Sequence, residues 1–378
     1  MHFTLLQRRI GAQTILNMIL IAGLMSVFIA CGGGDSGNEP TPPPSKPSSG
    51  GGEEGGGSGG GDTPTVPEVP IEFTVPEEAG TRAALPTYIS SGFKTNSTIG
   101  VFAFYTGQTA WASASSTATP NFMYNQSVQR QLNGSWSYSP IKYWPNQQDD
   151  KLTFCAYFPH GGTGVTPSLN TATGLPVITF SVQEYSKDQV DLLMSEVVAD
   201  EQHITSSTQT NVSYKVSLSF KHALSQIVVN VVDGDHADNP LPFTATIIGW
   251  YDSGDCQPST SAAVNWSSRA IGGTVFSTEG SDTEGLTETN KNRQRIFLMI
   301  PGVLNGVGAP DGAVQMRFNY LLGGVPFVTD PVDLKATTGL TEWKPGKTYN
   351  YTYRVQHTGN DLSIAVNPWY QSGLVFDN

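Results

Sequence analysis

The chain has 378 residues, of which 14% are charged and 10% are aromatic. Its length suits two domains rather than one. The aromatic side chains supply the large apolar surface that a folded core needs and that disordered chains lack. A formal net charge of −12 excludes the basic surface that nucleic-acid binding requires, so no partner of that class is expected.

The N-terminus has the pattern of an export signal. Arg8 and Arg9 form a positive start, and the run from there to Ala30 carries no charge. A charged start, an apolar run and a small residue before the cut define a secretory signal. Because Cys31 follows Ala30, the stretch resembles a bacterial lipoprotein signal, in which Cys31 becomes the acylated first residue and carries palmitate. A plain signal peptide and an N-terminal membrane helix are the alternatives.

A tether and a short strand follow the signal. Residues 31–70 are nearly all Gly, Pro, Ser, Thr, Glu and Asp, a composition that packs no core and is typical of a flexible linker. Residues 71–75 then alternate apolar and polar side chains, which predicts a strand with Ile71, Phe73 and Val75 on one face.

The loop after this strand contains Arg82. Between Cys31 and Arg82 the only other basic residue is Lys46. An Arg-specific protease therefore finds very few sites here, and exposed loops are where proteases cut. Cleavage would leave Ala83 as the new first residue. The alternative is that Arg82 is a solvated loop charge.

The remainder of the chain predicts an all-β fold. Short β-branched and aromatic runs alternate with Gly, Pro, Asn and Asp clusters, which is typical of strands and turns. Residues 186–198 suit one short helix or a strand, and the polar stretch 199–212 is the expected domain boundary. The clearest predicted strands are residues 98–105, 152–158, 177–182, 214–220, 226–232, 244–250, 295–300, 314–321 and 347–355.

Several segments, taken in order, resemble one family. They are Ile99-Gly100-Val101-Phe102-Ala103, Lys142-Tyr143-Trp144-Pro145-Asn146, Leu152 to Pro159, Phe220-Lys221-His222-Ala223-Leu224, Trp343-Lys344-Pro345-Gly346-Lys347 and Val366-Asn367-Pro368-Trp369. This set resembles the fimbrillins, the subunits of the type V pili of Bacteroidales, including their Mfa-like branch.

The resemblance implies a domain organisation. Two transthyretin-like β-sandwich domains in tandem are expected at 83–210 and 211–378. They would follow a signal peptide at 1–30, the tether at 31–70, and a removable strand with its cleavage loop at 71–82.

The resemblance also implies assembly by strand exchange. An Arg-specific protease cuts after Arg82, the strand with Ile71, Phe73 and Val75 leaves, and a terminal strand of a neighbouring subunit takes its place. The expected donor strand contributes Leu362, Ile364, Val366, Leu374 and Phe376. The implied partners are other fimbrial subunits and the outer membrane, reached through the lipid anchor. Adhesion ligands on host or bacterial surfaces stay open.

No catalytic or metal-binding pattern is legible. The six histidines show no zinc-type spacing, and no Ser/His/Asp or paired-carboxylate arrangement is visible. We therefore predict no catalytic residues, no metal and no cofactor. His222 is interpreted as a structural histidine, and residues 233–238 as a turn rather than a calcium loop.

Two further groups have alternative interpretations. Trp136, Tyr138, Tyr143 and Trp144 suit core packing, or stacking on a sugar. Cys155 lies in a predicted strand and Cys256 in a predicted polar loop, and in an oxidising envelope the two either pair or stay free.

The function favoured by the sequence is that of a fimbrial subunit at the cell surface, with its stalk, tip or anchor role open. The rival is a monomeric surface lipoprotein that binds glycan or protein and keeps its first strand. An enzyme is a distant third. Whether the first strand is removed or kept distinguishes the fimbrial subunit from the monomeric lipoprotein.

Overall fold

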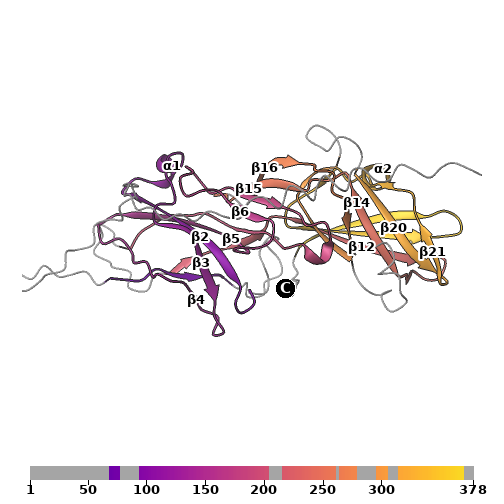
Figure 1. The fold of residues 1–378 in the computed structure, drawn as a ribbon, viewed down its shortest axis with the longest axis horizontal. Helices are drawn as coiled ribbons and strands as arrows, with labels where there is room; N and C mark the ends of the chain where they lie inside the picture. The colour runs from indigo at the N-terminus through magenta and orange to yellow at the C-terminus, as the bar shows by residue number, and fades with distance from the viewer. Residues whose placement is uncertain are drawn as a thin grey trace, which may run out of the picture. The chain divides into compact units, whose positions relative to one another are not determined.

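The protein is described here by a computed structural model, which covers residues 68–76, 93–203, 215–260, 264–278, 295–304 and 314–369. These residues are nearly all β, with only two short helices, α1 (Trp111–Ala114) and α2 (Leu334–Thr338), and one 3-10 turn, η1 (Ser186–Asp188) (Figure 1). The predicted all-β class is confirmed. Within the described ranges, no helix is long and apolar enough to cross a membrane.

The strands fall into two groups along the chain. The first group is β1 (Glu72–Thr74), β2 (Thr98–Gly107), β3 (Met123–Arg130), β4 (Trp136–Ser137), β5 (Lys151–Phe158), β6 (Val165–Pro167), β7 (Ile178–Ser181), β8 (Leu193–Ser195), β9 (Val198–Glu201), β10 (Lys215–Ser217) and β11 (Phe220–His222). The second group is β12 (Ser225–Asp233), β13 (Asn239–Pro240), β14 (Phe243–Ile248), β15 (Ser253–Gln257), β16 (Asn265–Ala270), β17 (Phe276–Ser277), β18 (Arg295–Met299), β19 (Gly302–Val303), β20 (Gln315–Leu322), β21 (Val325–Val328), β22 (Val332–Asp333), β23 (Glu342–Trp343), β24 (Lys347–Val355) and β25 (Asp361–Pro368).

Each predicted strand is present, and one is divided. The described part of the predicted strand 214–220 forms β10 and the start of β11, because the chain changes partner between them. The Leu218 N–H donates to the Thr74 carbonyl at 2.8 Å, and the Ser219 carbonyl accepts from the Glu196 N–H at 2.9 Å. Residues 186–198, where a helix or a strand was expected, hold η1, then β8 and the first residue of β9.

The central sheet of the N-terminal half has the strand order β11-β8-β5-β2-β3-β4, with β9 also paired to β5. Its middle strands are buried on both faces. In β2, Val101 faces one core, and Phe102 and Phe104 face another. Because successive side chains point to opposite faces, such a strand becomes a continuous apolar run. This explains the Val101 to Phe104 sequence.

Two smaller layers cover this sheet. The β1–β10 pair closes one core, and the sheet β16-β15-β7-β6 contributes to the other. The second layer combines strands from both halves of the sequence, since β7 pairs with β15. Likewise β10 and β11, which follow the predicted boundary at 210, pair with β1 and β8. The boundary itself stays a prediction.

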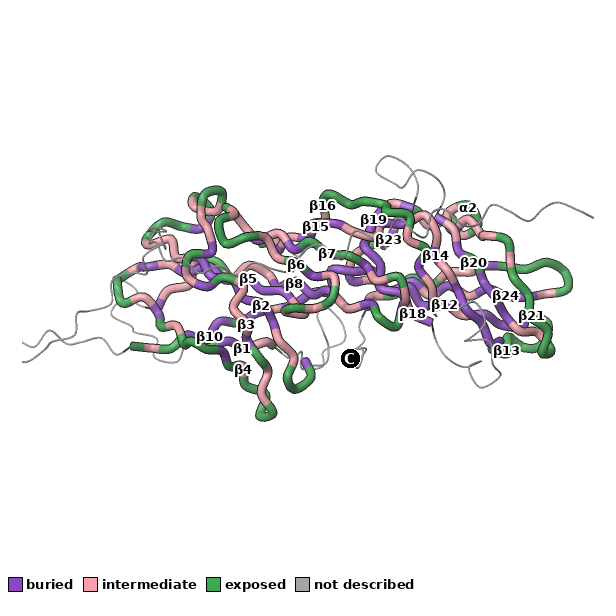
Figure 2. The backbone as a smooth tube through the Cα atoms, viewed as in Figure 1, coloured by how far each residue is buried: buried purple, intermediate pink, exposed green. Residues whose placement is uncertain are grey.

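The C-terminal half has two larger sheets, β13-β12-β24-β25 with β18, and β17-β14-β20-β21 with β22, and the small pair β19-β23. In β24 alternate residues, from Tyr349 to Val355, are buried, and Tyr353 stacks on Phe318 of the other sheet at 4.7 Å between ring centroids. Figure 2 shows buried residues along these strands, as along those of the N-terminal half. The two sheets therefore enclose an apolar core between them.

The prediction of a polar loop around Cys256 is wrong. Cys256 lies in β15 and is fully buried, as is Cys155 in β5, and both thiols are free. The sequence looked polar because Asp255 and Gln257 alternate with Cys256 and point the other way, where Asp255 accepts a hydrogen bond from Thr179 at 2.7 Å. Burial raises the pKa of both thiols, so they stay protonated.

Candidate functional site: the groove beside the first strand

β1 is held along one edge by β10, in a parallel ladder of only three residue pairs, from Glu72–Lys215 to Thr74–Ser217. An ion pair between Glu72 and Lys215, at 2.8 Å, crosses this ladder, but both side chains are about half exposed. Exposed pairs of this kind contribute about 0–1 kcal/mol. The backbone and the ion pair therefore hold β1 only weakly.

Apolar side chains hold β1 more strongly. Ile71 and Phe73 are buried, and the Phe73 ring contacts Tyr138 at 5.6 Å and Phe154 at 6.0 Å between centroids. Val75, less buried, packs against the same core. The three residues of the predicted apolar face thus fill one side of the N-terminal core. Fully burying such a side chain contributes about 1.5–3 kcal/mol each.

Among the described residues, the hydrogen bonds to the other edge of β1 lie at its start and form a short clamp. The Ile71 N–H donates to the Lys142 carbonyl at 2.9 Å, and the Trp144 N–H donates to the Val69 carbonyl at 2.9 Å. The Tyr138 hydroxyl donates to the Ile71 carbonyl at 2.9 Å. Burial raises the pKa of Tyr138 to about 12, so this hydroxyl keeps its proton and remains a donor at physiological pH.

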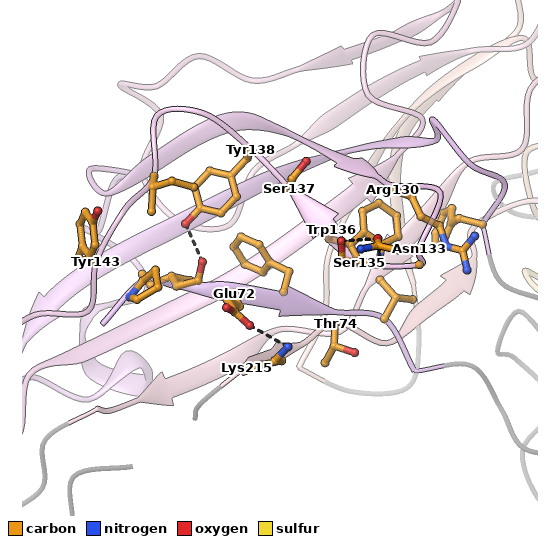
Figure 3. Close-up of a pocket in the computed structure, with 17 residues that line it drawn as sticks. Glu72, Thr74, Arg130, Asn133, Ser135, Trp136, Ser137, Tyr138, Tyr143 and Lys215 are labelled. Carbon is orange, nitrogen blue, oxygen red and sulfur yellow. Dashed lines mark hydrogen bonds and ion pairs between the residues drawn. The ribbon is translucent and has the colours of Figure 1, made fainter. Parts of the chain in front are cut away.

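A groove of about 780 Å³ is lined by β1 and by the β3–β4 hairpin (Figure 3). Gly134, with a φ of +84°, turns the hairpin in a conformation that favours glycine. The groove is lined by Pro70, Ile71, Glu72, Phe73, Thr74, Val75, Phe93, Arg130, Asn133, Gly134, Ser135, Trp136, Ser137, Tyr138, Ile141, Tyr143 and Lys215.

The four aromatic residues with alternative interpretations divide between the core and the groove. Trp144 and Tyr138 are buried in the N-terminal core, as the packing interpretation predicts. Trp136 is partly buried and packs edge-to-face on Phe93, at 5.3 Å between centroids. Tyr143 is 45% exposed and lies at the rim of the groove.

We expect Phe73→Ala to destabilise the uncleaved protein by about 3–5 kcal/mol, because it empties a buried aromatic position. Glu72→Ala, the matched control on the same strand, should cost about 0–1 kcal/mol. Chemical denaturation followed by tryptophan fluorescence measures both. Equal effects of the two substitutions would show that β1 contributes little apolar packing.

The expected donor residues divide at Trp369. Leu362, Ile364 and Val366 lie in β25, the edge strand of its own sheet, which pairs with β24 over eight residues. Leu362 is buried, Ile364 packs against the core, and Val366 is 48% exposed. Leu374 and Phe376 lie outside the described residues, as do Cys31, Arg82 and Ala83.

Trp369 anchors the end of β25. Its indole is 2% exposed and stacks on the His222 ring, with centroids 3.8 Å apart and planes within 10°. His222 is itself buried, and its Nδ1 lies 2.7 Å from the Asp191 carboxylate. The backbone N–H of Trp369 donates to the Gly346 carbonyl at 3.0 Å. His222 therefore has the structural role expected, though its partner across the stack was not foreseen from sequence.

The groove places apolar side chains beside the edge of β1, an arrangement that suits binding of a polypeptide strand. In the described residues no three His, Cys, Asp or Glu side chains form a group that could hold a metal ion. Residues 234–238 form a turn after β12, and Asp233 Oδ2, at the end of that strand, lies 2.8 Å from the His236 Nδ1. Sequence reasoning identified β1 but missed the hairpin wall of the groove, because Arg130, Asn133 and Ser137 look like ordinary turn residues.

The chain is similar in sequence to a known fimbrial protein. The fimbrium subunit Fim1C of Phocaeicola vulgatus is 37% identical over 161 residues, which is 40% of this chain and 40% of that protein. The chain therefore aligns with less than half the length of this curated relative.

Two solved structures share the fold. A fimbrial protein from Bacteroides vulgatus has 18% identity and a TM-score of 0.52, over 79% of this chain and 99% of its own. A protein from Bacteroides uniformis, described as a candidate cell adhesion protein, has 16% identity and a TM-score of 0.51, over 81% of this chain and 100% of its own. A family model described as fimbrillin-like matches residues 81–369, which is most of the chain. This chain belongs to the fimbrillin-like family.

Proposed function

We propose that this protein is a structural subunit of a fimbria at the cell surface, and that it joins other subunits by strand exchange. The observation that carries the proposal is the attachment of β1. Three ladder pairs and a short clamp hold its backbone, yet Ile71 and Phe73 complete the N-terminal core. Loss of such a strand would leave unfilled the core positions that its apolar side chains occupy.

Loss of β1 would leave the N-terminal core open. Tyr138 and Phe154 would lose their contacts with Phe73, and β10 would become an unpaired edge. An exposed apolar groove beside an unpaired edge favours pairing with another chain. Strand addition gains ladder hydrogen bonds and side-chain pockets together. Because the donor and the acceptor are different surfaces, the contact is head-to-tail and builds a filament.

The donor proposed here is the segment after Trp369, with Leu374 and Phe376 as its apolar anchors. β25 is less suited to leave, because its ladder with β24 and the Trp369–His222 stack would both have to break. On this proposal Leu362, Ile364 and Val366 support the base of the donor rather than forming its tip.

Release of β1 requires a cut, and we place it after Arg82, by an Arg-specific protease. N-terminal sequencing of the protein taken from the cell surface tests this directly. Ala83 as the first residue supports strand exchange. Detection of β1 on every surface molecule would favour the rival function, a monomeric lipoprotein that binds glycan or protein.

The anchor is a separate part of the proposal. Cys31→Ala should abolish incorporation of a fatty-acid label, because the cysteine thiol is the attachment atom. Serine at position 30, in place of Ala30, is the matched control and should keep the label, since it preserves a small residue before the cysteine. Undiminished labelling of Cys31→Ala would show that the chain is exported without this anchor.

We assign no enzymatic activity to the protein. The chain belongs to the fimbrillin-like family, and the carboxylate and the amine that line the groove, Glu72 and Lys215, are paired with each other. Peptidase and glycosidase assays on the purified protein should therefore give no rate above background.

A further inference from the structure

The two ends of β1 are held unequally. At its start, backbone hydrogen bonds reach β1 from both sides: from β10 on one side, and on the other through the Ile71 N–H, which donates to the Lys142 carbonyl at 2.9 Å. At its end, the hydrogen bonds of the described residues lie on the β10 side, where the Leu218 N–H donates to the Thr74 carbonyl at 2.8 Å. Burial falls in the same direction, from Ile71 at 1% exposed to Val75, which is only partly buried. β1 is therefore attached most firmly at its start.

The side chain of Tyr138 joins the start of β1 to the segment that clamps it, residues 138–144. Its hydroxyl donates to the Ile71 carbonyl at 2.9 Å and accepts from the Lys142 N–H at 3.3 Å (Figure 3). The Lys142 carbonyl in turn accepts from the Ile71 N–H, so the strand, the hydroxyl and the segment form one closed set of hydrogen bonds. Because Tyr138 is only 9% exposed, water competes little for these bonds.

The clamping segment is itself fixed to the rest of the domain. Trp144 is 2% exposed, and its ring contacts Phe154 of β5 at 5.9 Å between centroids. The Ser139 carbonyl accepts from the Gln126 side chain of β3 at 3.2 Å. Neither contact involves β1, so the segment stays with the domain when β1 leaves.

A cut after Arg82 changes only the far end of β1. The chain before Ile71 stays joined to the tether, whereas the chain after Val75 gains a free terminus. Chain ends open first, because each step of fraying breaks few contacts. We infer that β1 opens from Val75 towards Ile71, and that Tyr138 is the positioning residue that holds its start until last. The inference rests on the proposed function and adds a direction to it.

The direction fixes where the donor segment of a second copy enters. Departure of Val75 and then Phe73 uncovers the Phe154 ring and the edge of β10 while Ile71 is still bound. An apolar groove beside a free strand edge is the surface that strand addition uses. The donor therefore enters at the Val75 end and replaces β1 stepwise along β10, so that the core is never wholly open.

Amide hydrogen exchange tests the direction on the full chain, cut after Arg82 and kept so dilute that no second copy binds. We expect the Leu218 N–H, at the far end of the ladder, to exchange about tenfold or more faster than in the uncut protein. The Ile71 N–H, and the Trp144 N–H that donates to the Val69 carbonyl, should stay within about threefold of their uncut rates. Mass spectrometry with residue-level fragmentation measures all three.

The substitution Tyr138→Phe tests the positioning role. It removes the hydroxyl and keeps the ring against Phe73. The fragment 31–82 should leave the cut protein about tenfold faster than in wild type, since the Ile71 carbonyl and the Lys142 N–H each lose a partner. In the exchange experiment, the Ile71 N–H should lose its protection as well.

The matched control is Tyr105→Phe, which removes a hydroxyl that donates to Asp150 Oδ2 at 2.7 Å in the same domain. It should change the release rate by less than about twofold. Gel filtration measures release, with a fluorophore on the cysteine of Ser48→Cys. Cys155 and Cys256 are fully buried, so they do not compete for the label. Thermal melts of the uncut variants check that both fold.

The outcomes separate the inference from the proposed function. If Leu218, Ile71 and Trp144 lose protection together, β1 leaves in one step and the direction is wrong, while strand exchange stands. If Tyr138→Phe and Tyr105→Phe release the fragment at the same rate, Tyr138 does not hold the strand and the inference is overturned. If the fragment stays on cut wild type at concentrations where polymers form, β1 is not exchanged and the proposed function fails.

Discussion

Arg82→Ala is expected to keep the subunit monomeric after treatment with an Arg-specific protease, whereas treated wild type forms polymers. The reason is that β1 blocks its own position, with Phe73 packed between Tyr138 and Phe154. Without a cut, those side chains stay filled and β10 stays paired. Non-boiled gels and negative-stain microscopy measure the result, which should be a loss of all ladders above the monomer.

A second variant distinguishes cutting from strand release. Glu72→Cys/Lys215→Cys joins β1 to β10 covalently when oxidised, because the two positions are ladder partners. The protease should still cut this protein after Arg82, yet no polymer should form until a reductant frees β1. Polymers from the cut but oxidised protein would mean that β1 need not leave. Polymers from Arg82→Ala would mean that Arg82 is not the site.

Much of the fold was predictable from local sequence. The alternation of β1, the apolar runs of β2 and β5 and the alternating aromatic residues of β24 each specify a strand with a defined burial. Local patterns could not show which strands pair. The pairing of β7 with β15 joins residues 72 to 78 positions apart, and nothing in either segment indicates the other as its partner. The polar residues on either side of Cys256 likewise suggested a loop, although Cys256 is a buried strand residue.

The candidate site was predictable only in part. Ile71, Phe73 and Val75 carry a period of two that any buried edge strand shows. The opposite wall is built from Arg130, Asn133 and Ser137, whose role depends on the turn at Gly134 and on where the hairpin lies. The Trp369–His222 stack likewise joins a residue of β11 to the residue that follows β25. Sites made by side chains distant in sequence need the tertiary structure to be seen.

The substitution Leu374→Asp/Phe376→Asp is expected to abolish polymerisation of wild-type protein cut after Arg82. Each aspartate would place a charge where an apolar side chain enters the groove of the neighbour, and an unpaired buried charge is strongly unfavourable. Gln371→Asp/Ser372→Asp, with the same added charge in the same segment, is the control and should still give ladders on a non-boiled gel.

A cross-link then tests whether β25 itself moves. Asn350 and Ala365 are direct partners in the β24–β25 ladder, so Asn350→Cys/Ala365→Cys, oxidised, fixes β25 in its sheet. Because Trp369 is anchored by His222 and Gly346, the segment beyond it can extend without β25 leaving. The oxidised and reduced proteins should therefore polymerise equally. Polymerisation only after reduction would show that Leu362, Ile364 and Val366 leave with the donor, and that the stack on His222 opens during assembly.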